Sequence, residues 1–149
     1  MKKKIIGVVA IIVLLGGGIG LYMLNMPHRD ALNIEAEFNL TASELANQFL
    51  ENNKLANSTY LSEDGDSKVG IVKGKVIEVG KNAKGDSYVI IRDDKSFVGA
   101  QCSFQGKINV HISDNISVKG VIRSGAEYDE DFEEYIDVIM EQCYLINNN

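Results

Sequence analysis

The chain has no tryptophan, a single proline and only two histidines among its 149 residues. The histidines, His28 and His111, are far apart, and no group of Cys and His residues has the spacing of zinc ligands. We also find no nucleophile that is paired with a base. The sequence therefore predicts no catalytic residue, no metal site and no cofactor, and we expect the protein not to be an enzyme.

Basic residues are few outside the N-terminus. Without Lys2, Lys3 and Lys4, the chain has 12 basic residues against 21 acidic ones, a formal charge of -9. A phosphate backbone is repelled by such a domain, which makes nucleic acid a poor default partner. Five of the carboxylates fall in the segment Ser124 to Glu133, which we expect to be a solvated loop. Whether this loop binds a cation is left open.

Only one long apolar run is present, Ile5 to Leu24, and it contains no charged residue. As a helix, its 20 residues would span about 30 Å, the thickness of a bilayer's hydrocarbon core. The lysines before the run favour a cytoplasmic N-terminus. We therefore expect a lysine-rich cytoplasmic start at 1–4 and a single-pass transmembrane anchor at 5–24, with the C-terminal domain outside the cytoplasm.

A cleaved signal peptide is the alternative interpretation of this run. Gly16 and Gly18 could precede a cleavage site, but Ile19 to Leu24 continues apolar, which favours a retained anchor. No cysteine lies near the end of the run, so the start of a lipid-modified lipoprotein is absent. Gly16 and Gly20 form a G-x-x-x-G pair, a weak indication of a homodimer within the membrane.

After the anchor, residues 25–40 are expected to form a juxtamembrane linker, because Pro27 disfavours continuation of the helix. A packing helix should then begin near Thr41, which forms a capping-box spacing with Glu44. Leu45 and Phe49 recur at helical spacing and should face a core.

From Val69 onward the apolar residues recur with the period of strands. A glycine within the first strand, Gly74, predicts a bend there. Cys143 falls on the opposite parity to its strand neighbours, so a bulge near Glu141 and Gln142 is needed to turn it inward. The five predicted strands are Val69–Val79, Tyr88–Arg92, Phe97–Phe104, Asn115–Arg123 and Glu134–Ile146.

Five short strands after one helix predict a mainly β fold of the α+β class, a five-stranded OB-type Greek-key barrel over residues 41–149. The third and fifth strands of such a barrel lie side by side, which brings Cys102 near Cys143. Outside the cytoplasm this pair is expected to form a disulfide. Two buried free thiols are the alternative.

Barrels of this type bind ligands on the outer face of the second and third strands. Tyr88, Arg92 and Phe97 are the candidates on that face, and Lys81 and Lys84 lie in the loop at its rim. The aromatic rings could stack on nucleic-acid bases, whereas the acidic loop at the other rim would repel phosphates. Simple barrel packing is the alternative role of Tyr88 and Phe97.

Several short motifs resemble the tRNA_anti-like family of bacterial OB-fold proteins. They are Pro27-His28-Arg29-Asp30, the helix from Thr41, Gln101-Cys102-Ser103-Phe104, Val118-Lys119-Gly120 and the late Cys143. The resemblance implies an OB fold and an anchored location at the bacterial membrane, but no particular activity. The acidic turn Ser62 to Ser67 departs from the family's usual pattern.

The sequence thus favours a membrane-anchored binding or interaction module in the cell envelope, whose ligand is a protein, a peptide or a glycan. A single-stranded nucleic-acid-binding domain is the first alternative. An enzyme with a site that the sequence does not reveal is the second.

Overall fold

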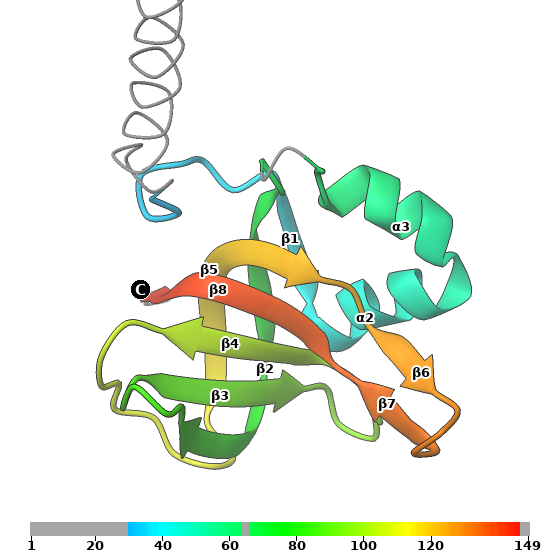
Figure 1. Cartoon of the computed structure of the whole chain (residues 1–149). Helices are drawn as coiled ribbons and strands as arrows, with labels where there is room; N and C mark the ends of the chain where they lie inside the picture. The colour runs from blue at the N-terminus through cyan, green and yellow to red at the C-terminus, as the bar shows by residue number, and fades with distance from the viewer. Residues whose placement is uncertain (1–29, 64–65, 147–149) are drawn as a thin grey trace, which may run out of the picture.

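The computed structural model describes residues 30–63 and 66–146 (Figure 1). Five strands form a closed barrel in the order β2-β3-β4-β8-β5, and β5 pairs back to β2. The third and fifth of these strands in the chain, β4 and β8, lie side by side as predicted, and they run parallel. The expected mainly β barrel is confirmed. Its strands are β2 (Val69–Lys81), β3 (Ser87–Arg92), β4 (Ala100–Phe104), β5 (Asn115–Ser124) and β8 (Val138–Ile146).

Strand β2 closes the barrel because it pairs with two different neighbours. Its first half, Val69 to Lys75, pairs with β5, and its second half, Lys75 to Lys81, pairs with β3. Gly74 lies at the changeover, where a Cβ would come within 3.3 Å of the Arg92 backbone. A larger residue there would push β3 away, which explains the glycine that the sequence places in this strand.

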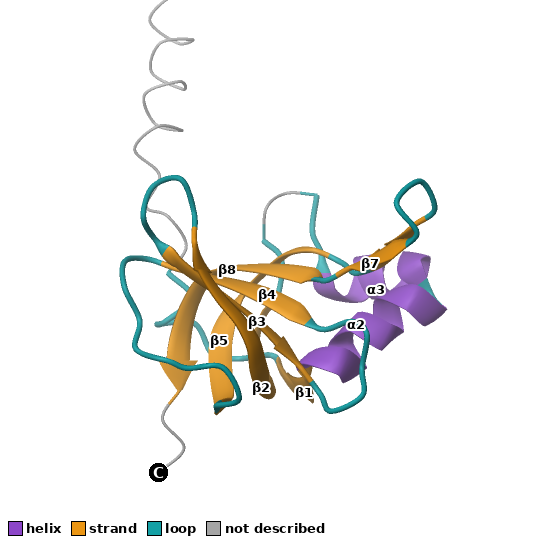
Figure 2. Ribbon diagram, turned by 90° about the horizontal axis from the view of Figure 1, so that it is seen from below, coloured by secondary structure: helices purple, strands orange, loops and turns teal. Residues whose placement is uncertain are grey.

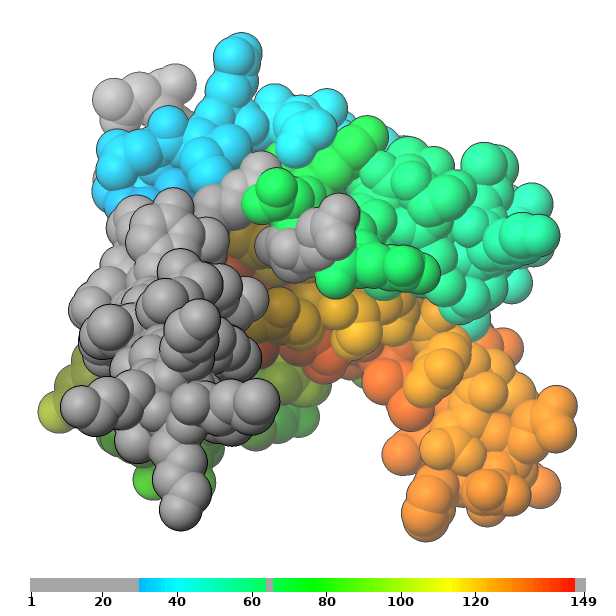
Figure 3. All heavy atoms as spheres, turned by 45° about the horizontal axis from the view of Figure 1, so that its top comes forward, coloured from blue at the N-terminus to red at the C-terminus, as the bar shows by residue number. Residues whose placement is uncertain are grey.

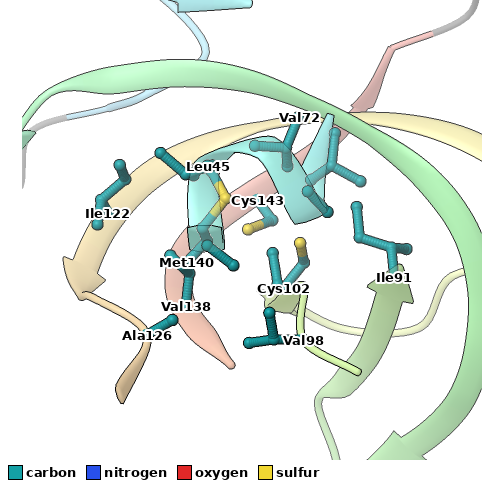
Figure 4. Packing of buried hydrophobic residues seen from close by; sticks show 14 of the residues in the cluster. Leu45, Val72, Ile91, Val98, Cys102, Ile122, Ala126, Val138, Met140 and Cys143 are labelled. Atoms are coloured by element: carbon teal, nitrogen blue, oxygen red, sulfur yellow. The ribbon is translucent and has the colours of Figure 1, made fainter. Parts of the chain in front are cut away.

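Alternate side chains of the strands fill the barrel interior (Figure 4). In β3, for example, Val89 and Ile91 are completely buried, whereas Ile90 between them is half-buried on the outer surface. Val72, Val118 and many others join the same cluster. A core packed in this way leaves the outer surface of the barrel as the place for a ligand.

Two helices, rather than the single one predicted, cover one end of the barrel (Figure 2). Helix α2 (Ala42–Glu51) begins at Thr41 with the predicted capping box, and it buries Leu45 and Phe49. Helix α3 (Asn53–Tyr60) follows at once, since Asn52 leaves the helical conformation and its side chain accepts a hydrogen bond from Leu55 N. Asn52 therefore ends the first helix and caps the second.

The last part of the predicted linker 25–40 belongs to the sheet. Strand β1 (Phe38–Thr41) pairs in parallel with β2, and the Phe38 ring lies against Gly70. Earlier still, Asp30 accepts a hydrogen bond from the Tyr144 hydroxyl at 3.0 Å. This bond raises the pKa of Tyr144, because the ionised phenol could no longer donate.

Two predicted strand starts are wrong. Strand β4 begins at Ala100 instead of Phe97, and β8 begins at Val138 instead of Glu134. The predicted acidic loop is a β-hairpin, formed by β6 (Glu127–Asp129) and β7 (Glu134–Ile136). The bulge near Gln142 is confirmed: the register with β4 shifts between Met140 and Cys143, and Gln142 has a φ of 52°.

The predicted lysine-rich start 1–4, the anchor 5–24 and the Gly16–Gly20 pair lie outside the described residues, so they stay predictions. Within 30–63 and 66–146, no helix has both the length and the apolar character needed to cross a membrane.

Candidate binding surface

The outer surface of β3 and β4 forms a continuous face of half-exposed side chains. Tyr88, Ile90 and Arg92 alternate outward along β3. Ile90 is the register partner of Gln101 in β4, and Tyr88 is the register partner of Ser103. We call this set of residues the β3–β4 face. It offers one aliphatic side chain, one ring and several uncharged hydrogen-bonding groups.

The five predicted site residues do not gather at one place. Lys81 pairs with Ser87 at the start of β3, and Lys84 lies in the following turn. Arg92 is at the other end of β3, about 17 Å away at 3.3 Å per residue, and Phe97 lies beyond it in the β3–β4 loop. Whether any of these residues binds a ligand stays a prediction.

The ring of Tyr88 is engaged within the fold. Its hydroxyl donates a hydrogen bond of 2.8 Å to Glu78 Oε1, and this bond with the nearby negative charge raises the pKa of Tyr88. The ring also lies against Gly80, where a Cβ would overlap it. One side of the ring is therefore covered by the β2 backbone.

The guanidinium of Arg92 is held by Asp137, which is not among the predicted site residues. Arg92 Nη2 donates to Asp137 Oδ2 at 2.8 Å, and Arg92 Nε donates to Asp137 Oδ1 at 3.2 Å. Asp137 is only 8% exposed, and its Oδ1 also accepts the backbone N–H of Gly99 at 2.7 Å. The positive charge predicted for the face is thus neutralised.

The β6–β7 hairpin projects outward beside the Arg92 end of the face (Figure 1). Tyr128 and Tyr135 are register partners across it, and their ring centroids are 4.9 Å apart. Asp129 Oδ1 caps the turn by accepting the N–H groups of Asp131 and Phe132. The sequence signal for this hairpin was the pair of tyrosines placed symmetrically about a polar turn, a cross-strand pattern hidden among the carboxylates.

Cys102 and Cys143 are both buried inside the barrel and are free thiols in the structure. Phe104, two residues after Cys102, is the register partner of Cys143. A hydrogen bond with Cys143 and burial raise the pKa of the Cys102 thiol well above its usual value. The predicted proximity is therefore correct, whereas the disulfide itself stays a prediction.

Near the Lys81 end of the face lies a surface pocket of about 310 Å³, and its lining residues are Val79, Gly80, Lys81, Ser87, Lys107 and Ile108. At the other end, the hairpin carboxylates point to no common centre: in the described part of the chain, no three His, Cys, Asp or Glu residues are placed to hold a metal ion. The two ends of the face therefore differ in charge, one basic and the other acidic.

Comparison with known proteins gives a family, and it also gives similar solved structures. No curated protein matches the chain. Among solved structures, a lipoprotein from Klebsiella pneumoniae, described as a candidate nucleic acid-binding protein, matches with a TM-score of 0.49 and 17% identity. That match covers 82% of this chain and 100% of the other. The family model named tRNA_anti-like matches residues 1–129, and the chain therefore belongs to the tRNA_anti-like family.

Proposed function

We propose that the protein is a non-catalytic binding module, anchored in the bacterial membrane by residues 5–24, that takes a polypeptide ligand on the β3–β4 face outside the cytoplasm. The family is built on an OB-type fold, and barrels of this type use this face for ligands. The apolar run and the lysines before it support the anchor.

One observation carries the choice of ligand: the Arg92–Asp137 pair removes the free guanidinium from the face. Binding of a nucleic-acid strand depends on cations that replace counterions along the phosphates. Lys75, whose register partner is Arg92, is likewise paired, with Asp94. The β3–β4 face itself therefore presents no unpaired cation to a phosphate backbone, and the nearby lysines Lys81 and Lys107 lie only at one end of it.

The remaining groups of the face suit a polypeptide. Ile90 supplies an apolar contact, and Gln101 and Ser103 supply donors and acceptors that an extended main chain can use. A glycan could use the same hydrogen-bonding groups. It would gain less from the half-exposed Ile90, so a polypeptide fits this face better.

Site-specific photo-crosslinking in living cells tests the proposal. A photoreactive residue replaces Gln101 on the face, and the control carries it at Lys54, an exposed position on α3. We expect a discrete adduct at Gln101 that protease digestion removes and nuclease treatment leaves intact, with no such adduct at Lys54. A nuclease-sensitive adduct, an adduct removed only by glycosidases, or equal labelling at both positions contradicts the proposal.

A further inference from the structure

The β6–β7 hairpin, residues 127–136, carries an aromatic surface that the fold does not use. Tyr128, Phe132 and Tyr135 are 47%, 75% and 44% exposed, and all three lie outside the core cluster. The space-filling view shows the hairpin as a lobe that projects from the body of the protein (Figure 3). Aromatic residues grouped on a projecting element are typical of an interaction surface, whereas single exposed apolar residues are ordinary.

Both ends of the hairpin are fixed to the barrel. At the first end, Ala126 is completely buried and Gly125 lies against the ring of Phe49. At the second end, Asp137 is held by Arg92 and by the Gly99 backbone. The exposed rings are therefore presented by an ordered element, and a partner would not have to order them on binding.

The charge on the hairpin restricts the partner. Residues 127–136 include six carboxylates and no lysine or arginine, a formal charge of -6. The ion pairs found between described residues involve Asp94, Asp114, Asp137 and Glu141, and none involves a hairpin carboxylate. Cations that approach this lobe therefore meet carboxylates with no ion-pair partner in the described fold and, on the same hairpin, exposed aromatic rings.

Other occupants fit this surface less well. A nucleic-acid strand or the hairpin of a second copy would place negative charge against the lobe. A lipid bilayer would require six carboxylates to lose water near the apolar rings. Lysine or arginine side chains suit both the carboxylates and the aromatic rings of the hairpin, since they pair with carboxylates and also lie over aromatic faces.

From the exposed rings and the complementary charge, we infer that the β6–β7 hairpin docks an extended, lysine- or arginine-rich segment of a partner protein. Basic side chains of the segment pair with the hairpin carboxylates, and its apolar or aromatic residues pack on Phe132 and the tyrosine pair. This inference rests on the proposed function, because it assigns a chemistry to the part of the polypeptide ligand that extends from the β3–β4 face onto the neighbouring hairpin.

The test uses the full chain in a neutral detergent and a short synthetic peptide that alternates lysine with valine or tyrosine and carries a neutral fluorophore. A matched peptide has glutamate in place of lysine. Fluorescence anisotropy at about 150 mM salt reports binding. We expect the basic peptide to bind with a saturating curve and the acidic peptide to show none. Equal binding of the two peptides, or no binding of either, would overturn the inference.

Matched variants locate the binding on the hairpin. Phe132→Ala should weaken binding of the basic peptide about tenfold, a common loss at a central aromatic contact. Leu55→Ala is the control, because Leu55 is also a largely exposed apolar residue, 61% exposed, but lies on α3, outside both the hairpin and the β3–β4 face. Glu130→Lys should also weaken binding, whereas Glu51→Lys changes the net charge equally at an exposed position on α2. If each control loses as much affinity as its partner, the hairpin is not the site.

A second copy of the chain is a rival occupant, through the basic pocket at Lys81 and Lys107. Light scattering measures the oligomeric state of the full chain in the same detergent, with and without Phe132→Ala. If the chain is a dimer and Phe132→Ala dissociates it, the inference is overturned in favour of self-association. If the peptide fails to bind while the adduct at Gln101 persists, the inference is wrong and the proposed function survives. A nuclease-sensitive adduct at Gln101 would instead remove the proposed function.

Discussion

Replacing Asp137 should destabilise the fold more than a surface substitution would. The Asp137 carboxylate is 8% exposed and accepts three hydrogen bonds, two from Arg92 and one from the Gly99 N–H. In Asp137→Ala, the guanidinium keeps its charge in a site where its side chain is only 25% exposed. The Gly99 N–H also loses its partner in a buried position.

The expected loss follows from the cost of these two unpaired groups. Removing one partner of a fully buried ion pair costs about 3 to 5 kcal/mol, and the partial exposure of Arg92 places the cost at the lower end. We therefore expect Asp137→Ala to lower the free energy of unfolding by about 3 kcal/mol. Asp137→Asn keeps one acceptor for the Gly99 N–H and should lose about half as much.

Urea unfolding of residues 25–149, followed by far-ultraviolet circular dichroism, measures these losses. Arg92→Met completes a double-mutant cycle with Asp137→Ala, and the two losses should fall short of additivity by about 1 to 2 kcal/mol. Additive losses, or a loss below about 0.5 kcal/mol for Asp137→Ala, would show that the pair does not stabilise the fold.

Three further predictions concern the barrel and its ligand. Gly125→Ala should destabilise the domain by about 1 to 3 kcal/mol in the same urea assay, because the new Cβ overlaps the Phe49 ring; an unchanged midpoint would refute the contact. Non-reducing peptide mapping of protein recovered from cells should yield a Cys102–Cys143 cross-link, whereas two freely alkylated thiols would exclude it. If the bond forms, Cys102→Ser should cost about 2 to 5 kcal/mol of stability. In fluorescence anisotropy at about 150 mM salt, single-stranded DNA and RNA should bind residues 25–149 with a dissociation constant weaker than about 1 μM.

The barrel strands could be predicted because the pattern that identifies each strand lies within a few consecutive residues. Alternating apolar residues in β3 and β5 determine which side chains face inward, and a shift of one residue would turn each of them outward. The opposite parity of Cys143 even located the bulge at Gln142 correctly. Each of these conclusions needed only the order of apolar and polar residues within one strand.

The hairpin was missed because its stability comes from residues far away in the chain. Taken alone, a run of carboxylates indicates a solvated loop, and an isolated two-stranded hairpin is marginal in water. The contacts that fix it, Gly125 with Phe49 and Asp137 with Arg92, join positions that no local pattern relates. Strand β1 was missed for a similar reason, since its four residues gain order by pairing with β2.

The same cause explains why the predicted binding site was only partly right. The outward direction of Tyr88 and Arg92 follows from strand periodicity, and the structure shows it. The hydrogen bonds and ion pairs of those side chains depend on partners elsewhere in the chain: Glu78 for the Tyr88 hydroxyl and Asp137 for the Arg92 guanidinium. Sequence periodicity gives the direction of a side chain, but it does not give the groups that neutralise its charge or accept its hydrogen bonds.

The Arg92–Asp137 pair links the two features on which the functional proposals rest. It removes the positive charge from the β3–β4 face, and it also fixes the second end of the hairpin. A domain adapted to bind phosphate would gain from an arginine left free at this position, because each phosphate contact needs an unneutralised cation. Here the cation is engaged in holding an acidic, aromatic element at the rim of the same face. The same ion pair therefore supports both the proposed polypeptide ligand on the face and the ordered hairpin on which we propose that a basic segment docks.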